Sequence, residues 1–177
     1  MKIVGVASGL LILMTGSCVT TATNAASRTP REVTEGFMEV LFASERDLFT
    51  DDQFKRQYFS RGLRRAIDQA LDEADEWEPP PHHPWGHPAH QDRFNRTIFN
   101  AWDLPTSFSI GEVSVRGTQA TVKVIYRWGE GSQYEGDERV TSVKLIREPD
   151  GWRIDDVVTH EGQFIPAGTL RSQLVEP

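Results

Sequence analysis

The chain has 177 residues, of which 38% are hydrophobic and 25% charged, and its formal net charge is −7. This size and composition are typical of one globular domain with a substantial apolar core, and they exclude a disordered chain. The single cysteine excludes an intrachain disulfide framework, and the acidic balance argues against a nucleic-acid partner.

The first seventeen residues resemble a secretory signal peptide. Lys2 is followed by an apolar run, Ile3 to Met14, which is too short to span a bilayer as a helix. The sole cysteine, Cys18, comes shortly after this run in a segment that resembles a bacterial lipobox, although Thr15 stands where that motif usually has leucine. The resemblance implies export, cleavage before Cys18, lipid attachment to its sulfur and anchorage to a membrane of the cell envelope or periplasm.

Ordinary signal cleavage after Ala25 or Ala26 is the alternative, and it would discard Cys18. In the lipoprotein interpretation, residues 18–28 form a polar tether. Residues 29–177 are then expected to form a single domain.

The beginning of this domain predicts three helices. Thr29-Pro30-Arg31-Glu32 has the pattern of a capping box with proline at the first helical position. A second helix start is predicted at Thr50 to Gln53, and Ser60 is expected to cap a longer helix. Apolar residues follow these starts at helical spacing: Val33, Phe37, Val40 and Leu41, then Phe54 and Tyr58, then Leu63, Ile67, Ala70 and Leu71. The acidic residues from Asp72 to Glu78 are interpreted as a solvated helix end rather than an interaction surface.

Residues 79–90 are predicted to form a loop rich in proline and histidine, because five prolines disfavour regular structure there. Four of the five histidines of the chain lie in this loop: His82, His83, His87 and His90. Imidazoles this close together are candidate ligands for zinc, copper or nickel. They lack zinc-ligand spacing with cysteine or a carboxylate, so polar loop residues are the favoured interpretation, and no cofactor is expected.

From Phe108 onward, the hydrophobic period changes to two, which predicts antiparallel strands joined by short turns. Gly111 is expected to mark a bulge, because the apolar parity changes there. Turns are predicted at Arg116 to Thr118 and at Glu148 to Gly151, with a longer loop at Gly129 to Gly136.

The last strand of the predicted sheet begins at Trp152. Its alternation predicts that Trp152, Ile154, Asp156 and Val158 point inward. The segment from Thr169 to Leu174 is expected to be either a final strand or a short capped helix.

Helices followed by strands predict an α+β domain in which N-terminal helices pack on a curved antiparallel sheet. This order of elements and the segment Gly151 to Val157, Gly-Trp-Arg-Ile-Asp-Asp-Val, resemble the nuclear-transport-factor-two-like, or cystatin-like, superfamily. Tyr58 to Leu63, Tyr-Phe-Ser-Arg-Gly-Leu, and the Trp-Arg-Ile-Asp-Asp ending are similar to an uncharacterised family of exported bacterial lipoproteins. Over residues 30–160 the resemblance implies a cone with a cavity, in a superfamily of isomerases, dehydratases, hydrolases and non-catalytic binders.

Four residues of the predicted sheet are candidates for lining such a cavity: Tyr126, Trp128, Trp152 and Asp156. Asp156 is the best candidate for a general acid or base, because the alternation places it among apolar residues on the Trp152 face. Tyr126 offers a hydroxyl group, and Trp128 offers a stacking surface on the same strand face.

A structural interpretation of the same residues is favoured. In it, Asp156 pairs with Arg127 or Arg153, while the tryptophans belong to the core. His160 follows Asp156 at the same parity, and Asp103 is a second acid near aromatic residues that also suits a turn.

The leading hypothesis is an exported, non-catalytic lipoprotein that binds a small apolar ligand or a protein partner while its lipid holds it at the membrane. An enzyme is less favoured, and would be a small isomerase or dehydratase that uses Asp156. A metal-binding envelope protein, acting through the histidine loop, is the third hypothesis.

Overall fold

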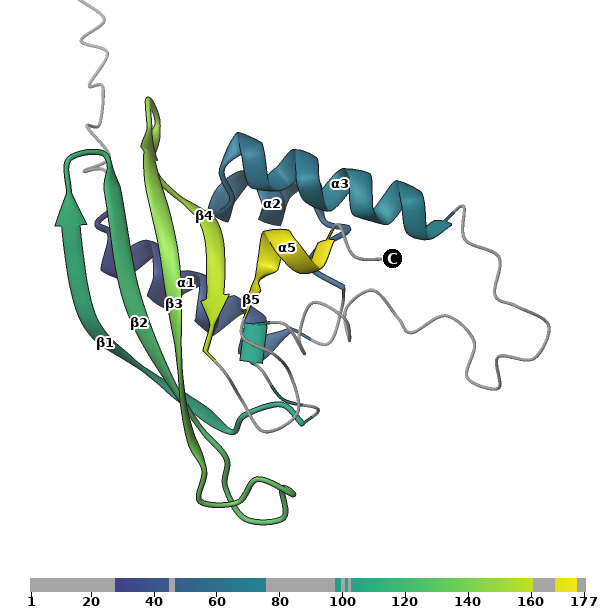
Figure 1. The fold of residues 1–177 in the computed structure, drawn as a ribbon, viewed down its shortest axis with the longest axis vertical. Helices are drawn as coiled ribbons and strands as arrows, with labels where there is room; N and C mark the ends of the chain where they lie inside the picture. Colours follow the sequence, from purple (N-terminus) through teal and green to yellow (C-terminus); the bar gives the residue numbers. More distant parts are fainter. Residues whose placement is uncertain are drawn as a thin grey trace, which may run out of the picture.

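The computed structural model describes residues 28–44, 47–75, 98–99, 101, 103–160 and 168–174. These residues form an α+β fold in which helices precede a five-stranded antiparallel sheet (Figure 1). The sheet is curved and open, with the strand order β1-β2-β3-β4-β5. The predicted fold class is confirmed at this level.

The N-terminal helices begin where local capping signals lie. They are α1 (Pro30–Ala43), α2 (Asp52–Tyr58) and α3 (Arg61–Asp75). The capping box of α1 is confirmed, because the Thr29 hydroxyl accepts from the backbone N–H of Glu32 at 3.2 Å and the Glu32 carboxylate accepts from the Thr29 backbone at 2.7 Å. The Asp51 side chain caps α2, and Ser60 Oγ accepts from Leu63 N at 3.0 Å to cap α3. None of the described helices has the length and apolarity needed to cross a membrane.

Each strand of the sheet pairs antiparallel with the next. The strands are β1 (Ser107–Arg116), β2 (Gln119–Arg127), β3 (Glu138–Glu148), β4 (Gly151–Thr159) and β5 (Gly168–Thr169). The β1–β2 register shifts between Ile110 and Val113, which confirms the bulge predicted at Gly111. Gly117 and Gly151 have φ values of +60° and +129° in the two predicted tight turns, a region that favours glycine.

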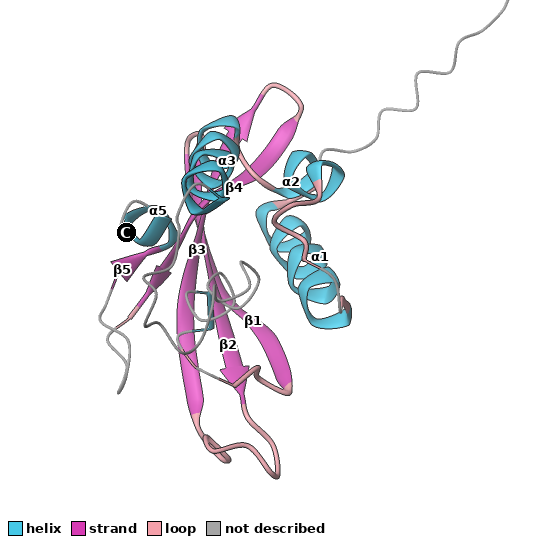
Figure 2. Cartoon of the chain, turned by 90° about the vertical axis from the view of Figure 1, so that its right-hand side faces the viewer, coloured by secondary structure: helices cyan, strands magenta, loops and turns pink. Residues whose placement is uncertain are grey.

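Most of the core lies between α1, α2 and one face of the sheet, as Figure 2 shows from the side, and buried residues of α3 and α5 extend it. Phe37 of α1 is fully buried, and its ring centroid lies 5.6 to 5.8 Å from those of Phe54, Tyr58 and Phe59. The sheet contributes fully buried residues such as Val122 to the same core. Burial of this apolar surface is the main stabilising contribution to such a fold.

The predicted inward pattern of β4 is wrong after Ile154. Leu145 of β3 pairs with Ile154, but Lys144 pairs with Asp156, so Asp155 is an extra residue in β4. A bulge of this kind reverses the alternation of side chains. Ile154 therefore shares the core face with Val157, whereas Asp156 and Val158 lie on the opposite face.

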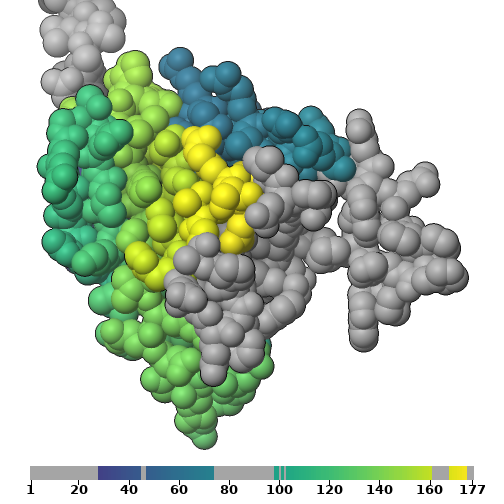
Figure 3. All heavy atoms as spheres, viewed as in Figure 1, coloured from purple at the N-terminus to yellow at the C-terminus, as the bar shows by residue number. Residues whose placement is uncertain are grey.

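The C-terminal segment contains both predicted alternatives, since the short strand β5 leads directly into α5 (Leu170–Leu174). Helix α5 lies on the opposite side of the sheet from α1 (Figure 2). It packs between β4 and α3, as the atoms in yellow show in Figure 3. Asp156, at the bulged end of β4, thus faces α5, while Val157 faces the main core.

Candidate functional site

Tyr126 is a fully buried residue of the core. Its hydroxyl donates to Met38 Sδ at 3.5 Å and accepts from Thr141 Oγ1 at 3.3 Å. Burial raises the pKa of the Tyr126 phenol well above its ordinary value, because the phenolate would lose its hydration. The hydroxyl is therefore neutral at physiological pH and is used in bonds within the core.

The two tryptophans predicted to line a cavity are also packed residues. Trp128 is 3% exposed, and Trp152 is 5% exposed. Trp128 Nε1 donates to the Asp103 backbone oxygen at 3.0 Å, and the Arg139 guanidinium lies 5.1 Å from the Trp128 ring centroid. The interpretation of both tryptophans as core residues is confirmed, and a cavity-lining role stays a prediction.

Asp156 contacts the C-terminal helix instead of the expected arginines. Its Oδ1 accepts from Arg171 N at 3.1 Å and from Val157 N at 2.9 Å. The predicted pairing with Arg127 or Arg153 is wrong, because these bind Glu138 at 2.8 Å and Asp150 at 2.7 Å, respectively. Asp156 thus satisfies a backbone donor in the first turn of α5. A catalytic role for it stays a prediction.

Asp155, the bulged residue, is a polar centre that the sequence analysis missed. Its Oδ1 accepts from Ser60 Oγ at 2.5 Å and from Arg171 Nη2 at 2.6 Å. Arg171 Nε also donates to the Asp155 backbone oxygen at 2.8 Å. These bonds join the start of α3, the bulge of β4 and α5.

The remaining sequence candidates have structural contacts or lie outside the described residues. Asp103 Oδ2 accepts from Ser132 Oγ at 3.1 Å and from Gln133 N at 3.2 Å, so this acid organises the loop between β2 and β3. His160 is exposed, and its Nε2 lies 3.3 Å from Ser142 Oγ. Cys18 and the histidines of residues 79–90 lie outside the described residues. Among the residues that are described, no group of three or more His, Cys, Asp or Glu could hold a metal ion.

A polar cleft of about 390 Å³ lies between α2 and α3, and we refer to it as the α2–α3 cleft. Its lining consists of Asp52, Lys55, Arg56, Arg61, Arg64, Arg65 and Asp68. Five of these side chains are basic and two are acidic, in a chain whose net charge is −7. Positive charge is therefore concentrated here against the overall balance.

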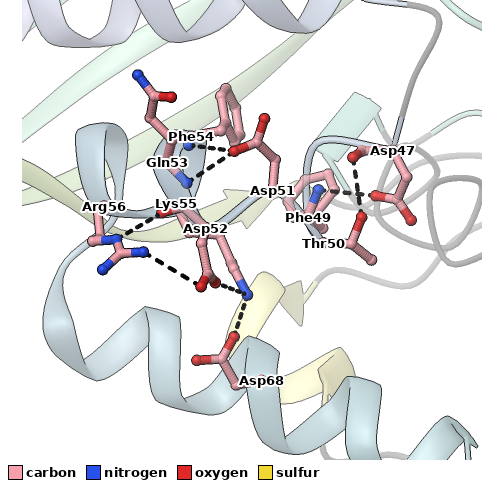
Figure 4. A network of polar contacts seen from close by, with 10 residues as sticks. All are labelled: Asp47, Phe49, Thr50, Asp51, Asp52, Gln53, Phe54, Lys55, Arg56 and Asp68. Atoms are coloured by element: carbon pink, nitrogen blue, oxygen red, sulfur yellow. Dashed lines mark hydrogen bonds and ion pairs between the residues drawn. The ribbon is translucent and has the colours of Figure 1, made fainter.

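Lys55 forms the link between the two walls of the α2–α3 cleft (Figure 4). It is 6% exposed, and its Nζ binds Asp68 of α3 and lies 3.2 Å from Asp52 Oδ1. Burial opposes the charge of Lys55, but hydrogen bonds and Coulombic attraction from Asp68 and Asp52 outweigh it and raise the pKa of the ammonium group. Lys55 is therefore charged, and its two acidic partners neutralise it locally.

The arginines of the α2–α3 cleft have weaker contacts with carboxylates than Lys55 has. Arg56 lies 3.4 Å from Asp52, and Arg61 Nε lies 3.8 Å from Glu148 Oε2. The buried Nε of Arg64 has no hydrogen-bond acceptor in the described part of the chain. Arg65 Nε donates only weakly, to the Arg61 backbone oxygen at 3.4 Å. Arg64 and Arg65 consequently present donors without a carboxylate partner among the residues described.

The sequence contains part of the signal for this cleft. Arg61, Arg64 and Arg65 have the i, i+3, i+4 spacing that places three cations on one helix face. Lys55 and Asp52 belong to a different helix, so only the packing of α2 against α3 brings the lining together.

No known protein family, curated protein or solved structure matches this chain. The superfamily resemblance noted in the sequence therefore stays a prediction.

Proposed function

We propose that this chain is an exported, lipid-anchored protein of the cell envelope whose folded domain binds a ligand rather than catalysing a reaction. Export and lipid attachment are inferred from the basic start, the short apolar run and the sole cysteine, Cys18. The binding role is inferred from the α2–α3 cleft.

The observation that carries the binding proposal is the lining of this cleft. A volume of about 390 Å³ is in the range of small-molecule sites. Its basic excess favours an anionic ligand over the apolar ligand expected from the sequence, because charged donors lose hydration when an apolar group covers them. Arg64 and Arg65 both line the cleft and have no carboxylate partner among the described residues, so their guanidinium groups can donate to an anion.

The contacts of the catalytic candidates favour binding over catalysis. Asp156 accepts hydrogen bonds from backbone N–H groups, and the Tyr126 hydroxyl is bonded to Thr141 inside the core. A general acid or base must reach a proton of the substrate directly or through one water. The Tyr126 hydroxyl is enclosed in the core, and the Asp156 carboxylate already holds the start of α5 through its Oδ1.

We also propose that the domain belongs to the nuclear-transport-factor-two-like superfamily and has its cone-shaped fold. The proposal is supported by the order of elements, with α1, α2 and α3 preceding a curved antiparallel sheet. It is further supported by the burial of Trp152 directly after the tight turn at Gly151.

The proposed lipid anchor and membrane location are tested on the protein made in a bacterial host. Mass spectrometry is expected to find a diacylglyceryl, N-acylated Cys18 as the first residue, and Cys18→Ala is expected to release the protein from the membrane fraction. Ser17→Ala is the matched control, since it changes a neighbouring residue and leaves the lipid acceptor in place. A native N-terminus at or after Ala26 would contradict the lipid anchor.

The proposed binding role is tested by melting the protein with small ions at constant ionic strength. A polyvalent anion that binds the folded state raises the melting temperature, whereas the neutral molecule glycerol at the same concentration is expected to leave it unchanged. The double variant Arg64→Gln/Arg65→Gln is expected to lose this rise. Arg116→Gln, an exposed arginine on β1, is expected to retain it. If phosphate, malonate and citrate all leave the wild-type melting temperature unchanged, the α2–α3 cleft is not an anion site.

A further inference from the structure

We infer that the α2–α3 cleft recognises a phosphate group, carried either by a small organic phosphate or by a phospholipid headgroup. This inference rests on the proposed binding function and assigns the chemical class of its ligand.

The three arginines of α3 lie within little more than one helical turn. Arg61 is four residues before Arg65 and three before Arg64, so their charges are neighbours and repel one another. The positive end of the helix dipole adds to this potential in the first turn of α3. An anion in the cleft would relieve this repulsion, because it would place negative charge beside the three guanidinium groups.

One oxyanion of the chain already occupies the start of α3. Glu148 Oε1 accepts from Arg61 N at 2.9 Å, and Glu148 Oε2 lies 3.8 Å from Arg61 Nε. This carboxylate shows that the helix start favours an anion, and it partly compensates Arg61. The uncompensated donors are therefore those of Arg64 and Arg65.

The two acidic residues of the lining do not cancel these donors. Asp68 binds the buried Lys55 Nζ, and Asp52 lies between Lys55 and Arg56 (Figure 4). Each carboxylate thus has a cation of α2 as its close partner. The positive excess remains with the arginines of α3.

A phosphate group fits this arrangement better than a carboxylate. A carboxylate has two oxygens in one plane and is matched by a single guanidinium fork, whereas a phosphate has oxygens in tetrahedral directions that can accept from several guanidinium groups. The cleft volume of about 390 Å³ leaves room for an organic group attached to the phosphate. A phosphate ester is therefore the class of ligand expected.

The position of Arg28 beside α2 connects the cleft with a membrane source of phosphate, a lipid headgroup. Arg28 Nη2 donates to the Gln57 backbone oxygen at 3.5 Å, and its guanidinium lies 5.4 Å from the Tyr58 ring centroid. Residue 28 is thus held at the end of α2. If Cys18 carries the lipid, a ten-residue connection reaches at most about 35 Å from the membrane.

The soluble-ligand arm of the test is calorimetric titration of the Cys18→Ala chain with glycerol 3-phosphate and with malonate. Both probes carry about two negative charges near neutral pH. We expect glycerol 3-phosphate to bind about tenfold more tightly than malonate, and Arg64→Gln to weaken it by about tenfold. Arg116→Gln removes the same charge elsewhere and is expected to leave the affinity within about twofold.

The lipid arm uses the same Cys18→Ala chain with vesicles of phosphatidylcholine, with and without phosphatidylglycerol. Binding that requires phosphatidylglycerol and is lost in Arg64→Gln, but not in Arg116→Gln, identifies a headgroup as the source and supports the inference even if glycerol 3-phosphate binds weakly. Vesicle binding that both variants retain overturns the headgroup source.

The outcomes separate the two proposals. If malonate binds as tightly as glycerol 3-phosphate and Arg64→Gln weakens both, the phosphate inference fails while the binding function stands. If neither soluble probe nor phosphatidylglycerol vesicles bind, both proposals fail.

Discussion

The core beneath α1 and the junction of α3, β4 and α5 are held together by different interactions. The core consists of packed rings around Phe37 and of aliphatic residues of the sheet. The junction has fewer buried apolar residues, such as Ile67 and Leu170, and adds charge-assisted hydrogen bonds centred on Asp155. Apolar burial therefore supplies most of the stability, while the polar bonds determine where a small element lies.

The reason for the difference is the size of α5. It has five residues, of which Leu170 and Leu174 are buried, so it has little apolar surface and is too short to be stable alone. Bonds from Arg171 to Asp155 and Asp156 give it a defined position on β4. A small element can therefore be placed by a strand bulge that presents two adjacent acids.

The largest effect is expected from Phe37→Ala in the core. Removing a fully buried ring that contacts three other rings leaves a cavity, and it should lower the free energy of unfolding by about 3–5 kcal/mol. Urea denaturation followed by circular dichroism measures this loss. Phe37→Leu, which retains most of the apolar volume, is the matched control. A loss as small as that of a surface substitution would contradict the packed core.

The junction is tested by Asp155→Ala, which removes the acceptor shared by Ser60 and Arg171. Loss of these charge-assisted bonds should cost about 1.5–3 kcal/mol, less than the loss at Phe37. Hydrogen exchange should show increased opening of α5 while the amides of β2 keep their protection. Asp150→Ala, a more exposed acid near the start of β4, is the control. Equal loosening of α5 and β2 would mean that the junction is not a separate local unit.

Tyr126→Phe tests the polar group inside the core. Removing the hydroxyl breaks its bond with Thr141 and should cost about 1 kcal/mol at neutral pH. Burial raises the pKa of the Tyr126 phenol in the folded protein above its value in the unfolded chain. The phenol therefore loses its proton first in the unfolded chain, and the native protein is destabilised as the pH rises above about 10. Above this pH, Tyr126 is expected to lower the free energy of unfolding by up to about 1.4 kcal/mol per pH unit. Tyr126→Phe should remove this slope in unfolding experiments between pH 8 and about pH 11.5. An unchanged slope would show that the hydroxyl is hydrated.

The smallest effect is expected from Asp156→Asn, because the amide oxygen can still accept from Arg171 N. The free energy of unfolding should fall by less than about 1 kcal/mol, whereas Asp156→Ala, which has no acceptor, should lose about 1–2 kcal/mol. Thermal melting of the two variants beside wild type provides the measurement. Increased stability of both variants would instead indicate that the carboxylate opposes folding, as a catalytic acid held in an unfavourable environment would.

The sequence by itself determined the features that depend on a few neighbouring residues. Thr29 and Ser60 mark helix starts, because their hydroxyls reach backbone donors only three residues away. Gly117 and Gly151 mark tight turns, since glycine adopts positive φ without steric cost. The β1 bulge at Gly111 was also predictable, because the apolar parity changes on either side of it.

Only the tertiary structure decided the features that depend on distant partners. The bulge at Asp155 has no glycine and no gap in its local pattern; it is recognisable from its pairing with β3 and from its bonds to Ser60 and Arg171, which are 95 and 16 residues away. One extra residue reversed the face of Asp156 and therefore the role expected for it. The α2–α3 cleft depends likewise on the packing of two helices, because no local pattern states which charged faces will meet. Periodicity specifies the faces of an element, whereas contacts between elements specify what each face meets.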